Sequence, residues 1–387
     1  MYQRLLNIQL PEKQSIFLWG ARQTGKSSFL KTTYPQACYY DLLDTRQLSK
    51  FSHSPHLLRE EVLAKQDIPI IIIDEIQKAP ALLNEVHWLI EHLHAQFILC
   101  GSSARTLKTA TTNLLGGRAW QYNFYPLTWA EVPDFQLLRA LQHGLVPRHY
   151  QADPTYITEY LQAYVDVYLT DEIRNQGLVR NLQGFSRFLE VAGMCNTEMI
   201  NLSNIARDCS VNRTSVQAYF QILIDTLLGY YVHPYQEKIK RDIVTHMPKF
   251  YFFDLAIGNF LGQQSVISLK GEVAGKSFEN FIAMELHAYR GLKRKRHAIT
   301  YWRTKHGLEV DFILGRAEVA IEVKISEQVH QQDLKGLIGF CEEHPNTKAI
   351  VVSQDPRPRL LTMGTDINIT ILPWQDFLAQ LWAGDII

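Results

Sequence analysis

The chain has 387 residues, 46% of them hydrophobic and 20% charged, which is an ordinary globular composition. Its length exceeds what one hydrophobic core usually holds, so we expect roughly two to four domains. Lysine plus arginine equal aspartate plus glutamate at 39 each. This balance excludes a strongly basic nucleic-acid coat, so any contact with nucleic acid must use local patches.

The first predicted element is a phosphate-binding loop between a strand and a helix. Residues 15–19 predict a buried strand, and residues 28–31 predict the first turn of a helix. The intervening Gly-Ala-Arg-Gln-Thr-Gly-Lys-Ser completes a G-x-x-x-x-G-K-S motif, whose backbone N–H groups converge on a phosphate at the helix N-terminus. We expect Lys26 to reach the β- and γ-phosphates of ATP and Ser27 to ligate Mg²⁺. The alternative is a chance glycine turn.

The next element, residues 68–75, is an apolar run that ends in two carboxylates, Asp74 and Glu75. Such a run predicts a central parallel strand covered on both faces, with ligands at its carboxyl end. We expect Asp74 to hold the Mg²⁺ shell and Glu75 to act as general base toward water. A strand end capped by solvated acids is the alternative. The expected nucleotide-binding residues are Gly20, Ala21, Arg22, Gln23, Thr24, Gly25, Lys26, Ser27, Ser28 and Asp74.

A third buried strand is predicted over residues 96–103, and it ends in Ser102 and Ser103. Here the chain resembles the AAA+ ATPases, a resemblance that implies a γ-phosphate sensor at Ser102. A Gly-Gly-Arg segment ending at Arg118 precedes a strand-like run over residues 119–125 and resembles an arginine finger. The resemblance therefore implies a homo-oligomer in which Arg118 completes the neighbouring subunit's site. Arg105 is the competing candidate, and a surface arginine in a glycine turn is the alternative.

Beyond Pro126 the alternation of strand and helix stops, and residues 156–193 have helical spacing. Residues 201–231 resemble a helix-turn-helix in a winged-helix frame, which implies DNA as a possible partner through the second helix. The exposed polar side of that helix is predicted to carry Arg213, Thr214, Ser215 and Gln217, with Lys238, Lys240 and Arg241 in a hairpin wing. The alternative is a structural lid packed on the ATPase core.

The C-terminal quarter predicts a second chemistry on two strands, residues 309–314 and 317–325, joined by a turn. Period-2 geometry puts Glu322 and Lys324 on one face, and the hairpin brings Asp311 beside them. Asp311 and Glu322 would then hold a second divalent ion, Mg²⁺ or Mn²⁺, with Lys324 near the developing charge.

A helix predicted over residues 277–286 carries Glu279, and with it the set resembles the PD-(D/E)xK nuclease superfamily. The resemblance implies catalytic roles for Glu279, Asp311, Glu322 and Lys324. A later helix with Gln328, Gln331, Gln332 and Lys335 is predicted to support the site. A basic run, formed by Arg290, Lys293, Arg294, Lys295 and Arg296, is either a phosphate-backbone contact or a solvated turn. The alternative for the whole region is an inactive domain that docks a partner.

These parts predict an α/β protein: an N-terminal P-loop AAA+ parallel sheet in residues 1–148, a helical and winged-helix middle in 149–262, and a restriction-endonuclease-like α/β domain in 263–387. The layout resembles a large bacterial and archaeal group of AAA+ ATPases with an uncharacterised C-terminal domain. The implied function is an Mg²⁺-dependent ATPase coupled to DNA binding or processing. The alternative is a nucleotide-switched interaction protein with a non-catalytic C-terminal module.

The five cysteines are far apart and form no C-x-x-C pair, which argues against a zinc site or a disulfide framework. The first twenty residues lack a basic head followed by an apolar core. Apolar stretches stay far below the ~20 residues that span a bilayer. We therefore expect a cytoplasmic protein with no membrane partner.

Overall fold

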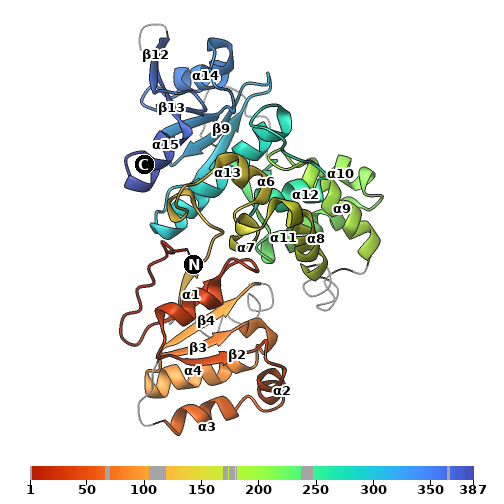
Figure 1. Ribbon diagram of the computed structural model, residues 1–387, viewed down its shortest axis with the longest axis vertical. Helices are drawn as coiled ribbons and strands as arrows, with labels where there is room; N and C mark the ends of the chain where they lie inside the picture. Colours follow the sequence, from red (N-terminus) through yellow and green to blue (C-terminus); the bar gives the residue numbers. More distant parts are fainter. Residues whose placement is uncertain are drawn as a thin grey trace. The chain divides into compact units, whose positions relative to one another are not determined.

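The computed structural model describes residues 2–65, 70–103, 119–168, 173, 179, 181–236, 247–363 and 367–387. The chain forms two compact units (Figure 1). Unit 1 comprises Met1–Pro126 and Leu223–Leu228, and unit 2 comprises Leu127–Ile222 and Gly229–Ile387.

Unit 1 is built on a five-stranded sheet of order β2-β3-β4-β1-β5, in which every neighbouring pair is parallel. Its strands are β1 (Ser15–Trp19), β2 (Cys38–Asp41), β3 (Ile71–Asp74), β4 (Phe97–Gly101) and β5 (Ala119–Asn123). Its helices are α1 (Lys26–Thr33), α2 (Thr45–His53), α3 (Leu57–Leu63), the 3₁₀ turn η1 (Ile76–Lys78) and α4 (Leu82–Leu93). The predicted N-terminal parallel sheet is therefore confirmed.

Both faces of this sheet are covered, as the continuous apolar runs require. On one face Ile71, Ile73 and Leu99 join a core with side chains of α2, α3 and α4. Ile72 and Ile98, which alternate with them along the strands, are also fully buried. After β1 the chain crosses to β2 at the edge of the sheet and then returns through β3 and β4, so β1 lies between β4 and β5. An open α/β sheet binds ligands at the carboxyl ends of its strands, where the strand order reverses in this way.

Unit 2 begins with helices and ends in a mixed sheet. The helical elements before the sheet are η2 (Trp129–Glu131), α6 (Leu137–His143), α7 (Pro147–Gln151), η3 (Pro154–Tyr156), α8 (Ile157–Val167), α9 (Leu182–Met194), α10 (Leu202–Asp208) and α11 (Arg213–Asp225), whose last residues group with unit 1. Asn201 caps α10, and Asn212 accepts from the Ser215 amide in the first turn of α11. The predicted pair of short helices thus exists with a four-residue turn, residues 209–212, between them.

The sheet of unit 2 has eight strands in the order β12-β13-β11-β10-β9-β8-β6-β7. Its strands are β6 (Gly229–Pro234), β7 (Lys249–Phe252), β8 (Ile299–Arg303), β9 (Glu309–Leu314), β10 (Val319–Val323), β11 (Lys348–Ser353), β12 (Arg359–Met363) and β13 (Ile367–Pro373). The accompanying helices are α12 (Leu255–Leu261), α13 (Glu272–Leu292), η5 (Gln331–Leu334), α14 (Lys335–Glu343) and α15 (Trp374–Ala383). β6 pairs antiparallel with β7 and parallel with β8, so the β6–β7 pair forms one end of this sheet.

Two local expectations for this region need correction. The strand expected over residues 317–325 is shorter, because β10 ends at Val323 and Lys324 follows it. Gln328 lies in a bend and not in a helix, whereas Gln331 and Gln332 begin a 3₁₀ turn that leads into α14 at Lys335. Across the described ranges, no helix combines the length and the apolar character needed to cross a bilayer.

Candidate functional site

The first candidate site lies at the carboxyl edge of the unit 1 sheet. There β1 leads into the glycine loop, β3 ends at Asp74 and β4 is followed by Ser102. Because β3, β4 and β1 are neighbours in a parallel sheet, their carboxyl ends meet at one edge. The sheet therefore brings the predicted loop, carboxylates and serine together.

The loop's shape depends on two glycines. Gly25 precedes α1 with a φ of 97°, a left-handed conformation that favours glycine. A Cβ on Gly20 would lie 2.5 Å from the carbonyl oxygen of Phe124, so any side chain there would displace the loop. The buried Thr24 hydroxyl donates to the Ala21 carbonyl at 2.8 Å and closes the turn. The first turn of α1 carries no acidic residue, which leaves the helix N-terminus favourable to an anion.

Lys26 is buried and folds back over its own loop. Its Nζ donates to the carbonyl oxygens of Gly20 at 2.7 Å and Ala21 at 2.9 Å. Both partners are neutral, so these contacts leave the charge of the ammonium uncompensated. Among the other predicted loop residues, Arg22 is half-buried, and Gln23 and Ser28 are exposed.

Asp74 is buried and accepts two hydroxyl groups on one oxygen. Ser27 Oγ donates to Asp74 Oδ2 at 2.6 Å, and the Tyr39 hydroxyl donates to the same oxygen at 2.5 Å. Burial, and then the hydrogen bond to Asp74, raise the pKa of Tyr39. The predicted pair of Mg²⁺ ligands, Ser27 and Asp74, is thus assembled, with Tyr39 as a third member that the sequence motifs did not reveal.

Glu75 follows the strand in a left-handed conformation, with a φ of 60°. Its Oε2 accepts the Ser102 hydroxyl at 3.1 Å and the Gln77 side-chain amide. Gln77 Nε2 also lies 3.1 Å from Ser102 Oγ, so the three side chains form one network. Ser102 is therefore beside the predicted general base. Arg105 and Arg118 lie outside the described residues.

These residues suit ATP with Mg²⁺: a glycine loop at a helix N-terminus, a lysine that donates to neutral carbonyls, and a hydroxyl paired with a carboxylate. Lys26 would hold the phosphates, while Ser27 and Asp74 would hold the metal. Bound Mg²⁺ supplies positive charge that offsets the phosphate oxygens.

The second candidate site is the exposed side of α11. Arg213, Thr214 and Gln217 are exposed and Ser215 is half-buried. A pocket of about 440 Å³ is lined by Arg213, Gln217 and Gln221 together with residues at the start of α10 and next to β7. Lys238, Lys240 and Arg241, expected in the wing, lie outside the described residues. The basic run after α13 is exposed from Lys293 to Arg296.

The third candidate site is a carboxylate cluster in unit 2, which we define as Glu279 of α13 with Glu309 and Asp311 of β9. Its centre is occupied by the ammonium of Lys249, a residue of β7 whose side chain is only 4% exposed. Lys249 Nζ lies 3.1 Å from Glu279 Oε1, 2.5 Å from Glu309 Oε1 and 3.7 Å from Asp311 Oδ1. Burial alone would lower the pKa of Lys249, but Glu279, Asp311 and Glu309 together raise it.

Glu322 and Lys324 stand beside this cluster as a pair of their own. Lys324 Nζ donates to Glu322 Oε1 at 2.6 Å, and the backbone N–H of Val323 donates to Asp311 Oδ2 at 2.8 Å. Burial, and then the negative charge of Asp311, raise the pKa of Glu322 to about 8. Burial raises the pKa of Glu279 to about 7 against the opposing effect of Lys249. The structure therefore gathers all four predicted residues in one region.

This arrangement does not fit a divalent ion as it stands. The Lys249 ammonium lies where an ion shared by these carboxylates would bind. Within the described ranges, no group of three or more His, Cys, Asp or Glu side chains is arranged to hold a metal. The second ion expected from the sequence is therefore unsupported. Lys249 itself carried a usable signal, since a lysine that opens the apolar run Phe-Tyr-Phe-Phe needs buried partners.

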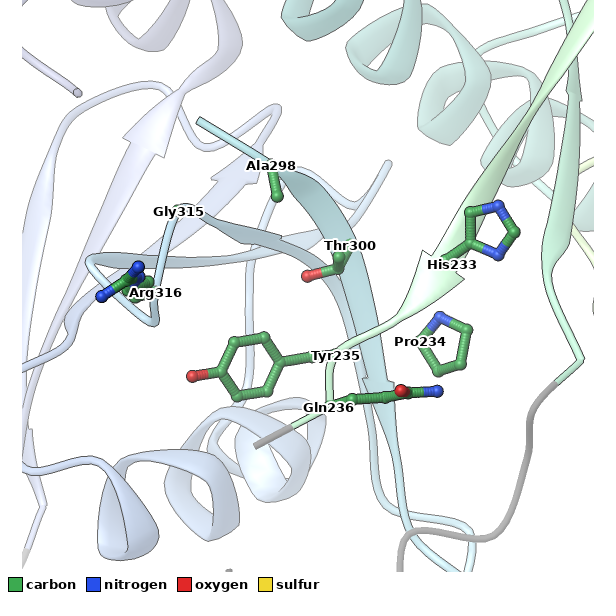
Figure 2. Close-up of a pocket in the computed structure, with 8 residues that line it drawn as sticks. All are labelled: His233, Pro234, Tyr235, Gln236, Ala298, Thr300, Gly315 and Arg316. Atoms are coloured by element: carbon green, nitrogen blue, oxygen red, sulfur yellow. The ribbon is translucent and has the colours of Figure 1, made fainter. Parts of the chain in front are cut away.

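Unit 2 has a further open pocket of about 640 Å³, lined by residues of β6, β8 and the turn after β9. Figure 2 shows the residues that line it. Tyr235 and Arg316 project beside it, and the Tyr235 ring packs edge-on against Phe340. The residues that line it include none of those predicted from the sequence to carry chemistry.

Comparison with known families agrees with the geometry of unit 1. Residues 12–133 match the sequence model of an AAA domain, so this part of the chain is an AAA-type P-loop ATPase domain. Residues 134–267 match a domain of unknown function, DUF8612, and residues 274–376 match another, DUF4143. The domain boundaries expected after residues 148 and 262 stay predictions.

Among individual proteins, the chain is 22% identical over 298 residues to an uncharacterized protein of Haemophilus influenzae, covering 72% of this chain and 71% of that protein. A solved Walker-type ATPase of Pyrococcus abyssi is 13% identical, with a TM-score of 0.43, covering 64% of this chain and 90% of that one. The ORC1 protein of Aeropyrum pernix, solved in complex with DNA, is 13% identical, with a TM-score of 0.30, covering 66% and 87%.

Proposed function

We propose that this protein hydrolyses ATP with Mg²⁺ and that its nucleotide state controls how unit 2 engages DNA. The observation that carries the first part is the position of Glu75. Its carboxylate is held by Ser102 and Gln77 at the sheet edge where Lys26, Ser27 and Asp74 also meet.

Each residue of this edge has its own part in the proposed reaction. The Lys26 ammonium exchanges the Gly20 and Ala21 carbonyls for phosphate oxygens, which carry full negative charge and bind it more strongly. Glu75 accepts a proton from the attacking water, which makes that water a better nucleophile. Ser102 and Gln77 position the Glu75 carboxylate, and the Ser102 hydroxyl would also sense the γ-phosphate.

Two substitutions test the hydrolysis proposal. Lys26→Ala should abolish tight nucleotide binding, because the phosphates lose their main side-chain cation. Glu75→Gln should bind ATP but release almost no phosphate, because the base is gone. Nucleotide affinity and phosphate release are measured for both, with Glu12→Gln, an exposed carboxylate of unit 1, as the matched control. Hydrolysis by Glu75→Gln at the wild-type rate would contradict the assignment of the base.

The DNA part of the proposal is supported by the exposed polar side chains of α11. Fluorescence anisotropy with duplex and branched DNA, with and without ATP, should show weaker binding for Arg213→Glu combined with Gln217→Glu. Lys270→Glu reverses the charge of an exposed lysine outside α11 and should bind normally. Equal affinity for wild type and both variants would favour the alternative, a nucleotide-switched interaction protein.

The proposal includes a homo-oligomer in which Arg118 acts on the neighbouring subunit's nucleotide. Hydrolysis per subunit should then rise with protein concentration, and a mixture of Arg118→Ala with Lys26→Ala should regain activity. For the C-terminal region, the sequence left metal-dependent DNA cleavage and a non-catalytic docking module open. The contacts of Lys249 favour the docking module.

A further inference from the structure

The carboxylate cluster of unit 2 contains its own cation. Lys249 reaches Glu279 on α13 and both Glu309 and Asp311 on β9, so one ammonium on β7 joins three separate elements. Its side chain is only 4% exposed, compared with 35% for Lys324 nearby. Of these two lysines, Lys249 is therefore the one whose ammonium is shielded from water.

Each carboxylate of the cluster also has a second partner. The Tyr251 hydroxyl donates to Glu279 Oε1 at 2.6 Å, Arg303 binds the other oxygen of Glu309, and the Val323 amide donates to Asp311 Oδ2. All three carboxylates are thus held in place around the ammonium. One oxygen nearby differs, because Glu322 Oε2 is buried without a hydrogen-bond partner among the described residues.

A divalent ion has different requirements. Mg²⁺ needs oxygen ligands at about 2.0–2.1 Å in octahedral geometry and keeps several waters. An ion at the centre of this cluster would displace the ammonium or stand beside it, and two cations close together in a poorly solvated space repel each other. Lys249 and a divalent ion therefore exclude each other.

We propose that the Lys249 ammonium is the resident cation of the carboxylate cluster and takes the place of a divalent metal ion, which binds there only when this ammonium is removed. The proposal concerns unit 2 alone and does not depend on ATP hydrolysis. In this proposal, the carboxylates of the cluster are neutralised by a lysine of the same chain and not by a metal ion.

The test measures Mn²⁺ binding and thermal stability of the full-length protein without nucleotide. Wild type should show no Mn²⁺ binding that depends on Asp311, and Mn²⁺ should not raise its Tm relative to Asp311→Asn. Lys249→Met should melt lower in EDTA, and millimolar Mn²⁺ should raise its Tm. Adding Asp311→Asn to Lys249→Met should remove that rise, and Lys249→Arg, which keeps the charge, should resemble wild type.

Two outcomes would overturn the proposal. The first is Asp311-dependent Mn²⁺ binding by wild type, which needs no variant of Lys249 to detect. The second is a folded Lys249→Met protein that neither binds Mn²⁺ nor gains stability from it. If Lys249→Met does not fold, Lys249→Met combined with Glu279→Gln removes a cation and a carboxylate together, and the same Mn²⁺ gain is expected from Glu309, Asp311 and Glu322.

Discussion

Each unit of this protein buries a lysine in a candidate site that also contains carboxylates, but the two lysines have different partners. Lys26 in unit 1 donates to two backbone carbonyls, whereas Lys249 in unit 2 lies among three carboxylates. Asp74 and Glu75 stand at the same sheet edge as Lys26, yet they are held by hydroxyl and amide groups.

The difference shows how similar residue types serve opposite purposes. An ammonium that neutral groups hold keeps its charge for an incoming phosphate, and the weak contacts are exchanged at little cost. An ammonium that carboxylates surround is already neutralised, and breaking such a buried set leaves uncompensated charge. A lysine in a binding site is therefore distinguished from a lysine in a stabilising cluster by the groups that its ammonium contacts, and not by the residue types nearby.

The largest expected effect is on stability. Lys249→Met should lower the free energy of unfolding by about 3–5 kcal/mol, because buried carboxylates lose their cation. Lys26→Met should cost only about 1 kcal/mol, since it frees two neutral carbonyls. Urea denaturation of both variants measures this, and equal losses would show that the two lysines do not differ as described.

Hydrolysis should reverse this order. Lys26→Met should lower kcat/KM for ATP by about 100-fold or more, as the loss of a charge-stabilising donor does in other sites. Lys249→Arg should leave kcat/KM unchanged, because its cluster belongs to another unit. Steady-state phosphate release gives both values, and a strong loss in Lys249→Arg would link the two sites.

Glu285 extends the comparison to a buried carboxylate held by neutral donors. It is 1% exposed, and it accepts from the Trp129 amide at 2.7 Å and the Trp382 indole at 2.8 Å. Burial raises its pKa to about 8, well above the usual range of a carboxyl group. The folded state therefore binds the Glu285 proton more tightly than the unfolded state does. The stability that this proton contributes is complete below the pKa of Glu285 in the unfolded chain, and it is lost as the pH rises through the pKa of Glu285 in the folded protein.

Between pH 6 and pH 8, the free energy of unfolding of the wild type should therefore fall by about 2 kcal/mol, and that of Glu285→Gln should not show this fall. The measurement is urea denaturation of both proteins across this pH range. The amide introduced by this substitution leaves one donor unmatched at every pH, so the comparison uses the slope and not the absolute stability. Parallel slopes would mean that Glu285 is ionised in the folded protein.

The smallest expected effect sharpens the description of unit 1. Gln77→Ala should lower kcat about tenfold, near 1.4 kcal/mol, with little change in KM, because Glu75 loses an amide that positions it. Gln121→Ala, at an exposed glutamine of β5, is the matched control. Faster hydrolysis by Gln77→Ala would show instead that Gln77 restrains the base.

The parts of unit 1 that could be predicted are those encoded by contiguous residues. A glycine loop between strand and helix, and an apolar run ending in Asp74 and Glu75, each determine their geometry within about ten residues. Tyr39 and Gln77 escaped prediction because neither residue type signals a contact with a carboxylate. The partner of Tyr39, Asp74, lies on another strand, and Gln77 contacts Glu75 from the 3₁₀ turn that follows β3.

The sequence by itself determined the parallel P-loop sheet and which polar residues stand at its edge, because strand pattern and loop chemistry are local properties. It also indicated Glu279, Asp311, Glu322 and Lys324 as one group. Only the tertiary structure decided what fills that group, since Lys249 comes from a strand 30 residues before Glu279 and reaches the cluster through the fold of the sheet and α13. The tertiary fold buries the Lys249 ammonium among carboxylates that are distant in the sequence, and no short motif contains both.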